Sequence, residues 1–243
     1  MVDRVTDKHK HGRGDTGYSD LALGQRVSKG SSLPLNYWGF DKLQHSLSNF
    51  VLYNPTLAED RDLQFIQYLL QMTFCINSVL YGANEPDWVE RFFFDSKCLD
   101  FMIERIEYFQ EQERQILGLE SISSEFVVLQ GYINSLRLNV RRVEIAWWQY
   151  RDLRREYYVK RIGELIEELD SHNKDPETVK QELNFYLDVV RVRFNSQGSI
   201  LNKLSSYFYW MARLDHVKSG KKFEHWMSSA PSLESFINPE VND

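Results

Sequence analysis

One stretch of the sequence constrains the fold more than any other. Apolar residues recur at helical spacing from Val127 to about Leu169, and no proline interrupts them. The two glycines inside the stretch, Gly131 and Gly163, are tolerable within a helix. The pattern therefore predicts one long helix.

Four other segments show the same periodicity, and they begin near Phe40, Leu63, Leu99 and Asp175. The last of these segments opens with an aspartate cap, a proline and a glutamate, and it reaches about Arg213. Short links join the five segments, and no strand pattern alternates with them. The sequence thus predicts an all-α, up-and-down five-helix bundle.

The predicted bundle occupies residues 37–218. The first forty residues hold six of the 12 glycines and few apolar positions, so we expect residues 1–36 to form a loop and entry segment. Residues 219–243 are mixed in composition and punctuated by proline. We expect them to form a tail that packs on the surface of the bundle.

Composition and charge exclude several classes of protein. The chain has 35 acidic and 29 basic residues and a net charge of −6, so it lacks the positive charge of a nucleic-acid binder. Residues 63–84 are uncharged, but glutamine, threonine, asparagine and serine interrupt them, which favours a buried helix over a transmembrane segment. Cys75 and Cys98 lie in apolar runs and are expected to be buried thiols. The N-terminus lacks an apolar signal core, so we expect an intracellular protein, in the mitochondrial matrix or the cytoplasm.

Charged residues form a line along the long predicted helix. Arg137, Arg141 and Glu144 follow one another at spacings of four and three, which places them on one face. Apolar residues border this line on both sides: Leu136, Val140, Val143 and Trp147 on one flank, and Leu138 and Ile145 on the other. Two interpretations stay open. The line is either a solvated face with arginine–glutamate pairs, or an arginine pair that meets an anionic partner, because an unpaired buried charge costs several kcal/mol.

Two further segments carry polar chemistry. On the last predicted helix, Asn202 shares a face with Ser205, Ser206, Tyr209 and Arg213; an asparagine inside a helix is either incidental or held by a partner. The N-terminal segment combines glycines with polar and basic residues: Gly14, Asp15, Gly17, Ser19 and Lys29. Glycine-rich backbone can direct amide hydrogens towards phosphate oxygens, and a lysine supplies a positive charge for them. No GK[ST] follows, so this segment is not a P-loop.

Taken together, these segments resemble the PduO-type ATP:cob(I)alamin adenosyltransferases, a family of trimeric five-helix bundles. The resemblance runs from Gly14 to Arg213. It rests on five ordered matches: RGDTGYS, GQRVSK, YWGFDKLQ, SLRLNVRRVEI and ILNKLSSYFYWMAR.

The resemblance implies that the chain transfers the adenosyl group of ATP to reduced cobalamin, with Mg²⁺ on the triphosphate. It implies a nucleotide site between neighbouring subunits, formed by Gly14, Asp15, Gly17, Ser19, Lys29, Arg141, Glu144 and Asn202. Arg141 would stabilise the departing triphosphate, and Glu144 would orient this arginine or the water shell of the metal ion. Asp41 and Arg137 would form a salt bridge across the subunit interface of a homotrimer, and Phe126 would face the corrin.

The sequence also departs from the family pattern. The segment around Phe126 stands several residues too close to Arg137, and Glu144 and Asn202 are 58 positions apart, much farther than in the family. The intervening residues 151–198 are expected to form an extended helical hairpin, and extensions of this kind often contact another chain. A second interpretation therefore stays open: a weak or inactive paralogue that serves as a structural subunit of a larger, possibly mitochondrial assembly.

Overall fold

The protein is seen in a computed structural model that describes residues 18–20, 26–28, 32–53, 59–80, 94–119, 127–129, 131–171, 174–221 and 224–225. Its helices are α1 (Ser32–Tyr53), α2 (Asp60–Leu80), α4 (Lys97–Leu117), α5 (Tyr132–Ser171), α6 (Pro176–Asp188) and α7 (Phe194–Lys218). A π-helical turn, η2 (Val189–Arg193), joins α6 to α7 without a break, because the flanking residues keep right-handed helical angles. The described chain thus forms five long helical rods, and the predicted all-α five-helix bundle is confirmed.

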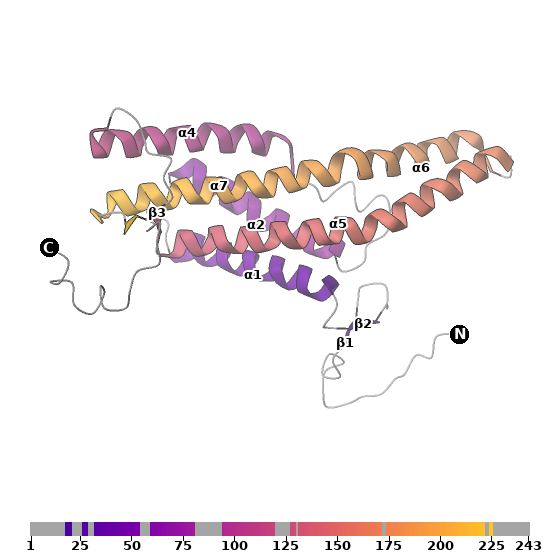
Figure 1. Ribbon diagram of the computed structural model, residues 1–243, viewed down its shortest axis with the longest axis horizontal. Helices are drawn as coiled ribbons and strands as arrows, with labels where there is room; N and C mark the ends of the chain where they lie inside the picture. The colour runs from indigo at the N-terminus through magenta and orange to yellow at the C-terminus, as the bar shows by residue number, and fades with distance from the viewer. Residues whose placement is uncertain are drawn as a thin grey trace.

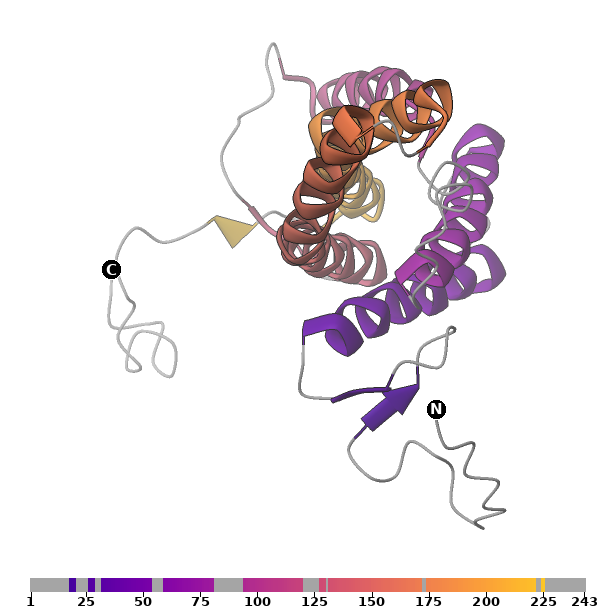
Figure 2. The same cartoon turned by 90° about the vertical axis from the view of Figure 1, so that its right-hand side faces the viewer.

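The helices run side by side along one axis (Figure 1). Helix α7 contacts both α5 and α4, α5 contacts α1, and α1 contacts α2. The view along the axis places α1 and α2 on one side of the bundle and α5, α7 and α4 on the other (Figure 2). The second half of α5 and the whole of α6 project beyond the other helices, and they form the extended hairpin that the sequence predicts (Figure 1).

The apolar faces predicted by the periodicity meet at the centre of the bundle. Helix α1 contributes four fully buried side chains: Phe40, Leu43, Leu47 and Phe50. The predicted apolar line of α5 is buried as well, at Leu136, Val140, Val143 and Trp147. Each such side chain stabilises the fold by about 1.5–3 kcal/mol. These faces therefore fix the rotation of α1 and α5 about their axes.

After its charged first turn, helix α2 consists of uncharged residues from the stretch that the sequence assigns to the protein interior. Ile66, Leu69 and Ile76 on this helix are buried. None of the described helices is long and apolar enough to cross a membrane. Cys98 is buried and Cys75 is half-buried, and both are free thiols.

A buried ion pair joins α4 to α7. The Arg213 guanidinium donates to both oxygens of the Glu113 carboxylate, with 2.6 Å between Nη2 and Oε1. The two side chains are only 4% and 0% exposed. Loss of one partner leaves the other charge buried, at a cost of about 3–5 kcal/mol. Arg213, which ends one of the five sequence matches, therefore stabilises the packing of α7 against α4.

Aromatic side chains fill the base of the extended hairpin. Tyr158 of α5 and Tyr186 of α6 have ring centres 5.5 Å apart, and Tyr158 also lies 5.9 Å from the ring of Phe194. Farther out, Arg161 of α5 forms an ion pair with Glu182 of α6 at 2.9 Å. The hairpin thus shares an apolar core with the bundle at its base and is held by charged side chains beyond it.

The starts of two helices differ from the sequence prediction. Helix α1 begins at Ser32, within the predicted loop of residues 1–36, because Pro34 falls in the first turn, where its missing amide hydrogen costs no helical hydrogen bond. Helix α5 begins after Gly131, whose φ of 104° is not helical. The prediction that Gly131 lies inside the long helix is therefore wrong.

Two short strand pairs accompany the helices, and the sequence analysis does not predict them. β1 (Tyr18–Asp20) pairs antiparallel with β2 (Arg26–Ser28), and β2 contacts α1. β3 (Val127–Val128) pairs antiparallel with β4 (Glu224–His225). The second pair links the residues just before α5 to those just after α7.

Candidate functional site

The fold brings together three residues that the sequence singles out on two different helices. Arg141 Nη1 lies 2.7 Å from Glu144 Oε2 on α5 and donates to Asn202 Oδ1 on α7 at 3.1 Å. The Arg141 side chain is 49% exposed, whereas the Glu144 side chain is 12% exposed. The arginine is thus held by two oxygens while part of its guanidinium still faces solvent, where an anion can reach it.

Packing on both helices explains why these side chains meet. Val140 and Val143 are fully buried on α5, and Leu201 and Leu204 are buried on α7. Helices α5 and α7 share an extensive contact. Burial of these apolar residues therefore fixes the rotation of each helix about its own axis, and with it the polar side chains that face each other. Asn202, left open by the sequence as incidental or partnered, has Arg141 as its partner.

Arg137 lies one turn before Arg141, in a different environment. Its Nε donates to Asn134 Oδ1 at 2.8 Å, and its guanidinium carbon lies 6.0 Å from the ring centre of Tyr209. Burial, and next the charge of Arg141, lower the pKa of Arg137 from its ordinary value. Among the described residues no carboxylate forms an ion pair with Arg137, so this half-buried cation lacks an anionic partner within the part of the chain that is seen.

Asp41, the other half of the predicted interface pair, lies on α1. Its carboxylate is exposed and accepts a short hydrogen bond from the Asn77 side-chain amide of α2. Asn77 is 5% exposed, and its Oδ1 is buried with no hydrogen-bond partner among the described residues. Within the described chain, Asp41 and Arg137 form no ion pair.

Several predicted site residues lie outside the described residues: Gly14, Asp15, Gly17, Lys29 and Phe126. The backbone of Ser19 is described in β1, where the residue pairs with Val27. The strand pair that holds Ser19 contacts α1 through β2.

Sequence reasoning gave no role to Asn77, Asn134 or Tyr209. Asn77 is one of three buried polar residues of α2, with Asp62 and Thr73, so its place in the sequence gave little signal. Tyr209 follows Asn202 by seven residues and so shares its helix face. The contacts of Asn134 and Tyr209 with Arg137 depend on side-chain conformations that no spacing rule predicts.

No protein-family model and no curated protein matches the sequence. A variant PduO-type ATP:corrinoid adenosyltransferase from Lactobacillus reuteri, complexed with cobalamin and ATP, matches with a TM-score of 0.53 and 16% identity over 89% of this chain and 97% of that one. A second variant enzyme from the same organism, complexed with ATP, matches with a TM-score of 0.51 and 16% identity over 88% and 97%.

The chain shares the fold of the PduO-type adenosyltransferases. The identity is low, so this likeness extends to the architecture of the bundle and no further. In this chain the extended hairpin lies between Glu144 of α5 and Asn202 of α7.

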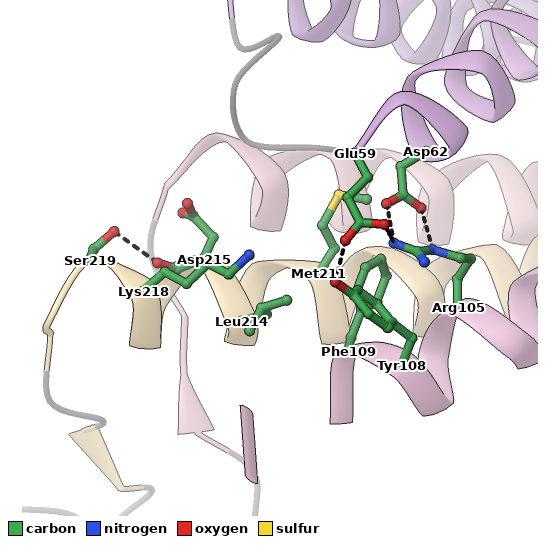
Figure 3. Close-up of a pocket in the computed structure, with 10 residues that line it drawn as sticks. All are labelled: Glu59, Asp62, Arg105, Tyr108, Phe109, Met211, Leu214, Asp215, Lys218 and Ser219. Atoms are coloured by element: carbon green, nitrogen blue, oxygen red, sulfur yellow. Dashed lines mark hydrogen bonds and ion pairs between the residues drawn. The ribbon is translucent and has the colours of Figure 1, made fainter. Parts of the chain in front are cut away.

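A cavity of about 350 Å³ lies away from this cluster, between the start of α2, the middle of α4 and the end of α7 (Figure 3). One wall is a buried ion pair in which Arg105 donates to both oxygens of Asp62, at 2.9 and 2.6 Å. Asp62 Oδ1 also accepts from the Tyr207 hydroxyl at 2.9 Å. Asp62 is 1% exposed, and both of its carboxylate oxygens accept hydrogen bonds from buried side chains.

The rim of the cavity is more open. Arg105 also donates to Glu59 at 3.0 Å, and the Tyr108 hydroxyl donates a short hydrogen bond to the same carboxylate. The Tyr108 hydrogen bond and the charges of Arg105 and Lys218 lower the pKa of Glu59, so it is ionised at neutral pH. The Glu59 side chain is 48% exposed and keeps free acceptor capacity towards the cavity.

Proposed function

We propose that this protein is an ATP:corrinoid adenosyltransferase. The observation that carries the proposal is the cluster of Arg141, Glu144 and Asn202, because three residues from two sequence matches meet at one point of a fold shared with such enzymes. A solvent-facing arginine held by two oxygens is a preorganised contact for phosphate.

The chemistry needs little from the protein beyond position and charge. The reduced cobalt centre of the corrinoid supplies an electron pair to the 5′ carbon of ATP, a cobalt–carbon bond forms, and the carbon–oxygen bond to triphosphate breaks. Arg141 stabilises the negative charge of the departing triphosphate. Glu144 keeps the guanidinium in place, and Asn202 fixes it from the other helix, so its orientation costs nothing at the moment of reaction.

The other nucleotide contacts come from the N-terminal segment. Gly14, Asp15, Gly17, Ser19 and Lys29 would line the phosphates with amide hydrogens and one positive charge. The contact of β2 with α1 supports a position for this segment beside the bundle. Mg²⁺ would accompany the triphosphate, with Glu144 as the available carboxylate for its water shell.

A second subunit completes the site in this proposal. Arg137 is half-buried without a carboxylate in the described chain, and Asp41 is exposed on another helix, so a symmetric homotrimer can pair each with its counterpart in a neighbouring copy. Leu138 and Ile145, which are 48% and 57% exposed, flank the charged line and would be covered by the same contact. Phe126 would approach the corrin near the start of α5.

Calorimetry with ATP and Mg²⁺ tests the proposal. Arg141→Ala should weaken ATP binding by about ten- to over a hundredfold, the value of one charge-assisted contact to phosphate. The control is Arg142→Ala: Arg142 is an exposed neighbour about 100° away on the same helix, and its loss should leave affinity nearly unchanged. If the parent protein binds no ATP at millimolar concentration, the enzyme proposal fails and the structural-subunit interpretation takes its place.

A further inference from the structure

We infer that the cavity between α2, α4 and α7 binds a small organic cation, an ammonium group carried on an apolar body. This inference is independent of the proposed function. The cavity lies on other helix faces than the Arg141 cluster, and Asp215 on its rim stands 13 residues beyond Asn202, about 20 Å along α7.

The charges around the cavity do not balance. Three carboxylates line it, Glu59, Asp62 and Asp215, against two cations, Arg105 and Lys218. Arg105 and Asp62 are both buried and their charges cancel, although Arg105 also donates to Glu59. Glu59, Asp215 and Lys218 remain at the open side, with a net charge of −1 that a monocation neutralises.

Asp215 is placed where a carboxylate is unfavourable for folding. It lies in the last turn of α7, where the helix dipole disfavours negative charge. It is half-buried, and no side-chain hydrogen bond or ion pair joins it to the other described residues, although its backbone oxygen accepts from Ser219. A bound cation removes this disadvantage.

The rest of the lining indicates an organic ligand. Phe109, Met211 and Leu214 are at most 5% exposed and give the cavity an apolar side. Its volume of about 350 Å³ lies in the range of small-molecule pockets, about 300–1,000 Å³. In the part of the chain that the structure describes, no group of three or more His, Cys, Asp or Glu residues is arranged to hold a metal ion. An ammonium on a hydrocarbon body suits both the carboxylate rim and the apolar side.

The ammonium group of Lys218 competes with a ligand ammonium for the carboxylates of the cavity. Figure 3 shows its side chain directed along the cavity towards Glu59, and its charge contributes to the lowered pKa of that residue. Lys218 is exposed and free to turn into solvent when a ligand ammonium enters. Asp215 and Lys218 should therefore have opposite effects on ligand affinity.

Three probes of one shape test the charge requirement: cyclohexylammonium, cyclohexanol and cyclohexanecarboxylate. Each is titrated into the full chain at neutral pH, and the methyl resonances of Met211 and Leu214 are followed by NMR. We expect the ammonium to shift these resonances saturably, the alcohol to bind more weakly and the carboxylate not to bind. Equal affinity for all three probes, preference for the carboxylate, or no shift at millimolar ammonium overturns the inference.

Two surface variants then test the assignment of the rim. Asp215→Asn should weaken ammonium binding by about three- to tenfold, the range for a partly exposed contact between opposite charges. Lys218→Met should strengthen it by a similar factor. Glu167→Gln, a matched loss of an exposed carboxylate on the hairpin, should change nothing. Asp215→Asn should also leave the Tm equal or higher. Unchanged ammonium affinity in both rim variants contradicts the assignment. So does weaker ammonium binding in both variants together with a lower Tm.

Discussion

Asn77 shows how a single buried amide can be costly for the chain that contains it. Its side chain donates to Asp41, but its own oxygen is buried without a partner among the described residues. A buried acceptor left unpaired costs about 1–3 kcal/mol, and a hydrogen bond to a charged group stabilises the fold by roughly the same amount. Asn77 therefore contributes little net free energy to the stability of the folded chain, and its hydrogen bond orients the Asp41 carboxylate.

Replacement of Asn77 by leucine separates these two effects. Asn77→Leu keeps the branched shape of the side chain and removes both the bond and the unpaired oxygen, so the free energy of unfolding should change by less than about 1 kcal/mol. Urea unfolding measures this change, and sedimentation measures the proposed trimer, whose assembly should weaken because Asp41 loses the hydrogen bond from Asn77. A loss of stability above about 2 kcal/mol would mean that the amide oxygen has a partner, contrary to this account.

At the same scale, the sequence predicts some residues of the candidate site and misses others for physical reasons. Arg141 and Glu144 follow from the regular 100° step of a helix, which aligns residues three and four apart. Their meeting with Asn202 does not follow from spacing, because it depends on how α5 and α7 face each other across 61 residues. The partner of Arg213, Glu113, lies 100 residues away and carries no local signal.

At the scale of elements, the close approach of α5 and α7 at the base of the hairpin depends on one glycine. A Cβ atom added to Gly198 would lie 2.0 Å from the ring of Trp148, far inside contact distance. Only a residue without a side chain lets the two helices pack this closely around the indole. The sequence predicts both helices but not this contact, since a glycine inside a helix usually indicates only a lower helix propensity.

Two glycine-to-alanine changes, one at the contact and one away from it, test whether Trp148 limits the spacing of the helices. Gly198→Ala should lower the free energy of unfolding by about 1–3 kcal/mol or more, because the ring has to move from a packed site. Gly163→Ala, in a helix interior with open space around it, should raise stability by about 0.5–1 kcal/mol through helix propensity. Chemical denaturation gives both values. Equal effects of the two changes would show that Trp148 does not limit the spacing of the helices.

The whole molecule should lose stability at alkaline pH through tyrosines that are fully or partly buried, Tyr207 and Tyr68. Burial raises the pKa of Tyr68 to about 12 from an ordinary value of 10.0, and burial together with Asp62 raises the pKa of Tyr207. The folded state therefore favours the neutral phenols. Their contribution to stability is complete below pH 10, the unfolded value, and is lost as pH rises from 10 towards 12.

Urea unfolding as a function of pH measures this loss. The free energy of unfolding should fall between pH 10 and pH 12 in the parent protein. Tyr68→Phe should be less stable at neutral pH, because the Asp95 amide loses its acceptor, and should show a shallower fall. A flat profile in the parent protein would contradict the burial of these side chains.

At the scale of the molecule, the number and order of the helices follow from periodicity, and the extended hairpin follows from the 58 positions between Glu144 and Asn202. The short strand pairs and the cavity do not. Two- and three-residue strands give no alternating pattern, and a cavity depends on how parts of three helices that are distant in the sequence converge. The sequence therefore predicts the residues of the Arg141 cluster, whereas the cavity between α2, α4 and α7 is seen only in the fold.

The central claim is tested most directly by one anaerobic assay, in which chemically reduced cobalamin and ATP with Mg²⁺ are mixed with the purified protein and the cobalt–carbon product is followed by its absorbance. The account predicts product formation that depends on ATP and releases triphosphate, with kcat/KM reduced by about ten- to a hundredfold in Arg141→Ala and nearly unchanged in Arg142→Ala. Product no faster than in the absence of protein would contradict it.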